Sequence, residues 1–168
     1  MREHEPIGGS RLRFASVEQV WLRQAMKWYF AVGLETATLV WTSLPGMRTY
    51  LGTHFAGFLA GAGIDDPVLC GDPDTELRAV ALGFLAHLRQ RRTRTGHPLS
   101  ATSVGLIQST VSGFYAFMAD HRSEAVAVLG EGRWAGLTDA HARLWRADGR
   151  SKNSAWGAGA STGRRAAT

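Results

Sequence analysis

Apolar residues recur at helical spacing in four separate segments of this chain, and that recurrence constrains its fold more than any other feature. The clearest stripe lies in residues 43–62, where a spacing of i, i+4, i+7, i+8 and i+11 places five apolar side chains on one helical face: Leu51, Phe55, Phe58, Leu59 and Ala62. The alternation of apolar and polar residues that marks a half-buried strand does not extend beyond a few residues. The pattern therefore predicts an all-α fold, as a bundle or orthogonal array of helices.

Capping residues and glycines indicate where the first two helices begin and end. The first is expected at residues 17–32 and should stop at Gly33, because glycine accepts the left-handed backbone that closes a helix. The second should begin at Ser43, whose hydroxyl can cap free amides, with Pro45 tolerated in the first turn. Residues 64–74, rich in Asp, Pro and Gly, have the composition of a connecting loop.

Two further long helices are expected after that loop. Asp72 or Asp74 can cap the third, whose last turns are basic and whose buried stripe consists of Leu77, Val80, Ala81, Phe84, Leu85 and Leu88. Ser100 is the best N-cap for the fourth, which runs to about Asp120 with apolar residues at alternating steps of three and four.

One domain accounts for most of the 168 residues, because 45% apolar and 20% charged residues are ordinary proportions for a chain with a single core. We expect a flexible N-terminus at residues 1–15 and a helical domain at residues 16–146, which ends in short helical stretches at 123–129 and 138–145. Residues 147–168 are rich in Gly, Ala and Ser without periodicity and are expected to be a disordered basic tail.

Several classes of protein are excluded by what the sequence lacks. Cys70 is the only cysteine, which excludes an internal disulfide framework and a multi-cysteine zinc site. The N-terminus is polar, which argues against a signal peptide, and no apolar run is long enough for a membrane helix. We therefore expect a cytoplasmic protein. HExxH, GxxxxGK and GxGxxG motifs are absent, and no base partner for a nucleophile is evident. We therefore expect no enzyme, metal, cofactor or small-molecule substrate.

Positive charge is concentrated near the end of the chain. The net charge is +5, and residues 145–168 contribute +4 of it through five basic residues against Asp148, which leaves +1 for residues 1–144. Such basicity permits attraction to phosphate backbones, and a tail that only improves solubility is an equal alternative.

The fourth helix is the most informative segment, because residues 100–119 contain no charged side chain. Away from the apolar stripe it carries small or uncharged polar residues: Thr102, Ser103, Gly105, Gln108, Ser109, Ser112 and Gly113. Such a face allows close approach by another helix or by a nucleic-acid groove, where Gln, Ser and Thr can bond to bases or phosphates. A fully buried central helix is the structural alternative.

A cluster of four arginines precedes this helix, namely Arg89, Arg91, Arg92 and Arg94. It has the composition of a phosphate clamp beside a helix that reads a groove. Two alternatives are that the arginines complement the dipole at a helix C-terminus, or that they form a solvated run of charge. Arg48 and Thr49, with Thr53 and His54, form a modest polar edge on the second helix. The acids of residues 65–76 would repel DNA, so a binding face must turn that loop away.

Together these segments resemble the N-terminal core-binding domain of phage-type integrases, which are tyrosine recombinases. The resemblance covers residues 17–146 and rests on a tryptophan-bearing first helix, on the aromatic and apolar spacing around TYLGTHFAGFL and TVSGFYAFM, and on the closing stretch GRWAGLTDAHARLWR. It implies a four-helix, SAM-like bundle, with one or two short C-terminal helices, that forms half of a clamp around double-stranded DNA.

By this resemblance, the second and fourth helices face the major groove. The groove-facing candidates are Arg48, Thr49, Thr102, Ser103 and Gln108. The candidates for backbone contacts are Arg89, Arg91, Arg92 and Arg94. The family's catalytic domain carries an Arg, a Lys, an HxxR motif and a nucleophilic Tyr, but this chain has no HxxR and no tyrosine after Tyr115.

We therefore expect the DNA-binding module of a site-specific recombinase or integrase without strand cleavage, from a truncated or frame-disrupted integrase. It should be monomeric alone, with recombinase protomers as possible partners on DNA. The second candidate function is a protein-interaction module, in which a partner helix docks on the fourth helix. The third is a small-molecule regulator, which would need an apolar pocket that the sequence does not show. Salt dependence separates the first two functions, because phosphate contacts weaken steeply as salt rises.

Overall fold

The computed structural model describes residues 12–67, 73–130 and 132–145, and within these ranges the chain consists of helices and their connecting loops. An isolated bridge between Arg92 and Pro98 is the only β pairing in the described chain. The predicted all-α class is therefore confirmed. Among the same residues, no helix has the length and apolar character needed to cross a membrane.

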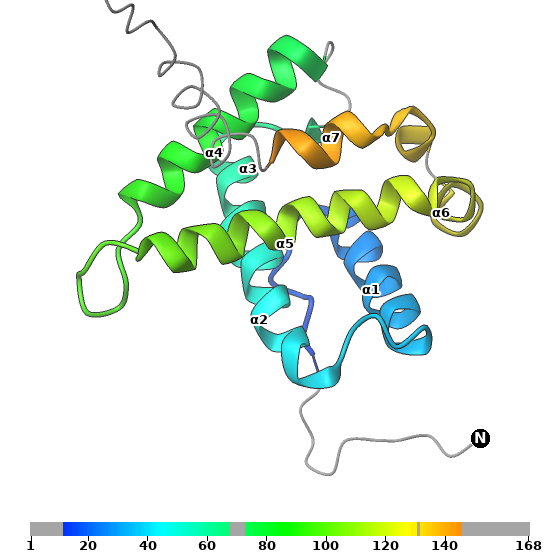
Figure 1. Cartoon of the computed structure of the whole chain (residues 1–168), viewed down its shortest axis with the longest axis horizontal. Helices are drawn as coiled ribbons and strands as arrows, with labels where there is room; N and C mark the ends of the chain where they lie inside the picture. The colour runs from blue at the N-terminus through cyan, green and yellow to red at the C-terminus, as the bar shows by residue number, and fades with distance from the viewer. Residues whose placement is uncertain (1–11, 68–72, 131, 146–168) are drawn as a thin grey trace, which may run out of the picture.

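The elements follow one another along the chain as shown in Figure 1. The α-helices are α1 (Val20–Glu35), α2 (Leu44–Thr49), α3 (Ala56–Ala62), α4 (Arg78–Gln90), α5 (Ala101–Asp120), α6 (Arg122–Leu129) and α7 (Asp139–Leu144). Short 3₁₀ turns lie at Trp41–Ser43 and Gly132–Gly136, and π-helical segments lie at Tyr50–Phe55 and Pro73–Leu77. Because α2, the first π-helical segment and α3 are contiguous, they form one helical rod, called here the α2–α3 rod (residues 44–62).

The first helix does not stop at Gly33, as the sequence predicted. α1 continues to Glu35, and Gly33 is buried inside it. The side chain of Leu39 folds back so closely that a Cβ on Gly33 would lie 2.5 Å from Leu39 Cδ1. The glycine therefore permits a close approach of the chain that follows the helix, which is a different use from closing it.

The second helical segment ends as predicted but begins differently. Gly63 follows α3 with a φ of 68°, the left-handed conformation that favours glycine at this position. Ser43 lies in helical backbone and its hydroxyl donates to the carbonyl of Val40 at 2.8 Å, so it does not cap α2. The predicted Ser43 cap is wrong because a preceding 3₁₀ turn already occupies this residue.

The start of α5 is capped as predicted, whereas that of α4 is not. Ser100 has extended backbone, and its hydroxyl accepts a hydrogen bond from the amide of Ser103 at 3.1 Å. α4 begins directly after Leu77 without a side-chain cap, because a π-helical segment that includes Asp74 precedes it. Asp72 lies outside the described residues.

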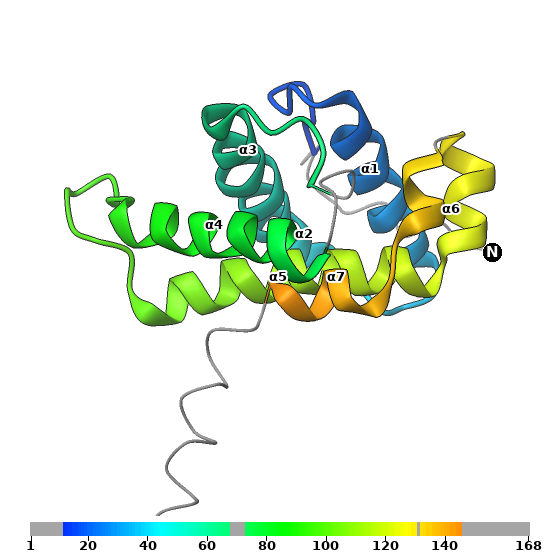
Figure 2. The ribbon, with the colours of Figure 1, turned by 90° about the horizontal axis from the view of Figure 1, so that it is seen from above.

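The core is built around α5, which runs the length of the molecule in both views (Figures 1 and 2). α7 lies along its second half on one side, while α1 and the α2–α3 rod pack on the other. The ring of Phe55 joins three elements, with centroids 5.4 Å from Phe84, 6.1 Å from Tyr115 and 5.2 Å from Trp145. Burying a side chain of this size stabilises the fold by about 1.5–3 kcal/mol.

Both predicted short helices are present, as α6 and α7, and each packs against part of α5. Thr138 and His141 form a reciprocal cap at the start of α7. The 3₁₀ turn before it buries Trp134, for which the sequence predicted no structural role.

The predicted domain bounds of 1–15, 16–146 and 147–168 stay a prediction at both ends of the chain. Residues 147–168 lie outside the described residues, as do residues 1–11. Residues 12–15 are described, and there Phe14 packs against Phe30 with ring centroids 5.9 Å apart. This aromatic contact holds the segment before α1 against that helix.

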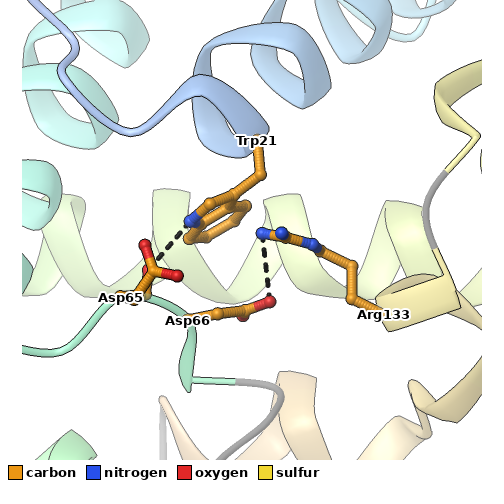
Figure 3. Close-up of polar contacts among 4 residues, drawn as sticks. All are labelled: Trp21, Asp65, Asp66 and Arg133. Carbon is orange, nitrogen blue, oxygen red and sulfur yellow. Dashed lines mark hydrogen bonds and ion pairs between the residues drawn. The ribbon is translucent and has the colours of Figure 1, made fainter.

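A polar network ties the acidic loop after α3 to the rest of the fold (Figure 3). The indole N–H of Trp21 donates to the carbonyl of Asp65 at 2.8 Å, and the guanidinium of Arg133 lies 3.1 Å from the carboxylate of Asp66. The same guanidinium lies over the Trp21 ring, 5.2 Å from a ring centroid. Asp66 is buried, so this partner offsets the desolvation of its charge.

Candidate nucleic-acid interface

The link between α4 and α5 is an ordered hairpin that carries most of the predicted arginines. α4 ends at Gln90, and Arg91 has extended backbone with φ −66° and ψ 140°. The amide of Leu99 donates to the carbonyl of Arg91 at 3.2 Å, and the amide of Thr93 donates to that of His97 at 2.6 Å. The last turn of α4 is basic as predicted, through His87 and Arg89, whereas Arg91, Arg92 and Arg94 lie on the hairpin.

The tip of this hairpin is fixed by its own hydrogen bonds. The amide of Gly96 donates to the carbonyl of Thr93 at 2.9 Å, which closes a four-residue turn. Gly96 has a φ of 83°, a conformation that other residues adopt only with strain. The hydroxyls of Thr93 and Thr95 lie 2.9 Å apart and add a further hydrogen bond. The turn therefore presents its charged side chains from a defined backbone.

The four predicted arginines, Arg89, Arg91, Arg92 and Arg94, are all exposed. Arg92 donates to the carbonyl of Gly96 at 2.9 Å, which orients its guanidinium without neutralising it. No ion pair joins any of the four to a carboxylate of the described chain. Their positive charge is therefore available to an anionic partner.

The first half of α5 lies directly beyond the hairpin and supplies an uncharged surface. Its exposed residues include Thr102, Gly105 and Ser109, together with Leu106, which is 51% exposed. The first turn of α5 contains no acid, and the partial positive charge of a helix N-terminus favours anions. The structure therefore brings the arginines together with the start of α5.

Two predicted groove contacts on α5 are less accessible than the rest. Ser103 is half-buried, and its hydroxyl shares a hydrogen bond with that of Ser100 at 2.9 Å. Gln108 is also half-buried, five residues farther along. We use the name hairpin patch for the set at the α4–α5 link, namely Arg89, Arg91, Arg92, Arg94, Thr102 and Ser103, and Gln108 lies beyond it.

The second half of α5 is a buried central helix, which the sequence left open as the alternative to an exposed face. Ser112 is only 3% exposed, and its hydroxyl donates to the carbonyl of Ala142 at 2.8 Å. Gly113 is half-buried, with the Tyr29 hydroxyl 4.0 Å from where its Cβ would lie. The exposed face does not form here because α7 covers this half of α5.

Arg48 and Thr49 are held by internal contacts and lie apart from the hairpin patch. A guanidinium N–H of Arg48 donates to the carbonyl of Arg13, and the hydroxyl of Thr49 donates to the carbonyl of Pro45 at 3.0 Å. Both residues are only partly exposed. In Figure 1, α2 lies near the lower edge of the molecule, whereas the hairpin forms its left end.

Only the part of the acidic stretch that directly follows α3 is turned away from α5. Figure 2 shows this part on the side of the molecule opposite α5 and α7, whereas the Pro73–Leu77 segment, which carries the exposed Glu76, packs against α7. Asp66 is paired with Arg133, and Asp65 is exposed. For the part that directly follows α3, repulsion of a polyanion near the hairpin patch is therefore weakened by distance and screening.

Two histidines lie next to the hairpin patch, and the sequence predicted no site role for them. Burial lowers the pKa of His54, and the charges of Arg91 and His87 lower it further. Burial also lowers the pKa of His87, again with a contribution from Arg91. Both imidazoles are therefore neutral at physiological pH.

The described residues contain no group of three or more His, Cys, Asp or Glu side chains that could hold a metal ion. Comparison of the chain with protein-family models, with curated proteins and with solved structures finds no match. The candidate interface therefore depends on the residues and geometry of this chain alone.

Proposed function

We propose that this domain binds double-stranded DNA through the hairpin patch and grips the duplex without cutting it. The observation that carries the proposal is a set of four exposed arginines without carboxylate partners in the described chain, next to the uncharged start of α5. Arginine guanidinium groups match phosphate geometry, and the ordered hairpin reduces the entropy lost on binding.

The proposed division of labour is that the hairpin contacts phosphates while the first half of α5 lies against a groove. Phosphate contacts supply affinity without reading sequence, and base-edge contacts supply specificity. Thr102 and Ser109 are exposed there, whereas Gln108 is half-buried and contributes less. Most of the affinity for DNA should therefore come from electrostatic contacts with phosphates, and the preference for particular base sequences should be weak.

In cellular terms, we propose a DNA-binding module of a site-specific recombination system, similar to an integrase core-binding domain. The SAM-like four-helix arrangement, a cytoplasmic location and assembly with recombinase protomers on DNA belong to this proposal. It assigns no catalytic residue in this chain. A purified sample that cleaved or joined a recombination-site duplex would contradict it.

The proposal is tested by measuring duplex affinity over a range of salt concentrations. The logarithm of the affinity should fall linearly with the logarithm of the salt concentration, by about 0.9 per phosphate contacted. Charge reversal in Arg91→Glu with Arg92→Glu should weaken binding strongly and reduce that slope by about one unit per arginine.

The matched control is Lys27→Glu with Arg78→Glu, which makes the same charge change at exposed sites on α1 and at the far end of α4. Similar losses in the two double variants would show that only net charge matters, and would contradict a localised interface. The absence of duplex binding at low salt would reject the function outright.

A second function is favoured by one observation, the exposure of Leu106 among the small residues of α5. A partner helix could pack there, since small residues allow close approach. Binding of that kind depends on apolar contact, so it should be insensitive to salt and be weakened by Leu106→Asp. The charge-reversal pair in the hairpin should leave it unchanged.

A further inference from the structure

His54 on the α2–α3 rod and His87 on α4 belong to the two elements that pack together beside the hairpin patch. The ring of Phe58 lies 5.5 Å from that of His87 and 5.3 Å from that of Phe84, which places this face of the rod against α4. His54 precedes Phe58 by one helical turn, and the amide of Arg91 donates to the carbonyl of His87 at 3.1 Å. The two imidazoles and the guanidinium are therefore within electrostatic range of one another.

Each imidazole has a ring nitrogen that the surrounding protein covers but does not satisfy. Nδ1 of His54 and Nε2 of His87 are buried, and neither has a hydrogen-bond partner in the described chain. Buried polar atoms are normally paired, so two such atoms in neighbouring side chains call for an explanation. Both residues remain partly exposed, and His54 lies in a π-helical segment, a feature that is frequent at functional sites.

Burial and positive charge are what lower the pKa values of the pair. The groups that act on His54 are Arg91 and His87, and the group that acts on His87 is Arg91, with no described carboxylate among them. A proton on either imidazole is therefore opposed by the guanidinium and by burial. An anion placed against Arg91 would remove that opposition and favour the imidazolium form of both.

We propose that His54, His87 and Arg91 form a proton-linked phosphate site, in which a phosphate group bound at Arg91 causes the two histidines to take up protons. The proposal deepens the DNA-binding function and rests on it, because the phosphate is then one of the duplex backbone. Linkage is reciprocal, so a group that raises proton affinity is itself bound more tightly at low pH. Duplex affinity therefore rises as the histidines become protonated.

The direct test follows the imidazole resonances of the full chain by NMR over about pH 5 to about pH 8, the range in which histidine changes charge. The probes are sulfate, a tetrahedral anion that does not titrate in this range, and a short DNA duplex. Each probe should raise the pKa values of His54 and His87. His121, which lies beyond α5 at the other end of the molecule, should show no change.

The outcomes separate this inference from the proposed function. Duplex binding without a shift at either histidine would overturn the inference and leave DNA binding intact. A sulfate-induced shift without duplex binding would keep an anion site, with free phosphate as its ligand, and reject DNA binding. The absence of duplex binding together with the absence of any histidine shift would reject both.

The variant test compares His54→Gln with His87→Gln against the control His97→Gln with His121→Gln. Wild-type duplex affinity should rise as the pH falls, by at most about tenfold per pH unit for each proton taken up. The first pair should lose most of this dependence, and the control pair should keep it. A dependence that disappears only in the control pair would assign it to the exposed hairpin histidine and overturn the proposal.

Discussion

The two halves of α5 share a lack of charge as far as Ala119, but they have opposite environments. The first half leaves Thr102, Gly105 and Ser109 open beside the arginine hairpin. The second half buries Ser112 and Tyr115 beneath α7 and the residue that follows it, and Met118 in the core. A helix face without charge is therefore compatible with a binding surface and with a core, and neighbouring elements decide between them.

The difference also shows why small polar residues serve two purposes on this helix. The hydroxyl of Ser112 supplies a partner for the carbonyl of Ala142, in the last turn of α7, where intrahelical partners are lacking. Three residues earlier, Ser109 is exposed. The same side-chain type thus fastens α7 in one half and leaves the surface free for a ligand in the other.

The largest expected effect is on stability, and it compares a core residue in the second half of α5 with an exposed residue in the first half. Met118→Ala should lower the free energy of unfolding by about 2–5 kcal/mol, because Met118 is fully buried and its removal leaves a cavity. Leu106→Ala, at a residue that is 51% exposed, should change it by less than about 0.5 kcal/mol. Denaturant unfolding of both variants gives the comparison, and equal losses would contradict an open first half.

A smaller effect is expected from the two serines. Ser112→Ala should cost about 1–3 kcal/mol, because a buried carbonyl loses its donor. Ser109→Ala should be nearly neutral and serves as the matched control on the same helix. Hydrogen exchange of the α7 amides should rise selectively in the first variant, and a neutral result there would show that α7 is held by apolar contacts alone.

The cap at the start of α5 should matter less again. Ser100→Ala removes the acceptor for the amide of Ser103 and should cost about 1 kcal/mol. Thr102→Ala, in the same exposed turn, should have almost no effect on unfolding. If Ser100→Ala also weakens duplex binding at low salt, the orientation of the first turn contributes to the interface.

The smallest expected effect is a pH dependence of the half that α7 covers. Burial lowers the pKa of His141 from its usual 6.5, although a hydrogen bond with Thr138 opposes that shift. The unfolded chain therefore binds the proton more tightly, and stability is full above pH 6.5 and declines as the pH falls toward the lowered pKa. Below that value the loss is complete.

Thermal unfolding over about pH 5 to about pH 8 checks this dependence. His141→Gln should reduce the slope in that range, whereas His97→Gln, a change at an exposed residue of the hairpin, should leave it unchanged. An unaltered slope in His141→Gln would assign the dependence to His54 and His87, whose pKa values are also lowered by burial.

Local signals in the sequence predicted most of the helices and several of their ends. The apolar stripe of residues 43–62, the Ser100 cap and the left-handed Gly63 all depend on contacts within a few residues. Gly33 and Ser43 were predicted wrongly because a side chain folding back and a preceding 3₁₀ turn replaced the local rule. The four arginines could be selected by composition, but the placement of Arg91, Arg92 and Arg94 on a hairpin could not.

The sequence by itself determined the helical periodicity, the uncharged character of α5 and the density of arginine before it, because these are properties of neighbouring residues. Only the tertiary structure decided that α7 covers the second half of α5, that Arg48 is held by Arg13, and that two histidines lie within electrostatic range of Arg91. These arrangements depend on packing between segments distant in the chain, and burial against a distant segment leaves no periodic signal of its own.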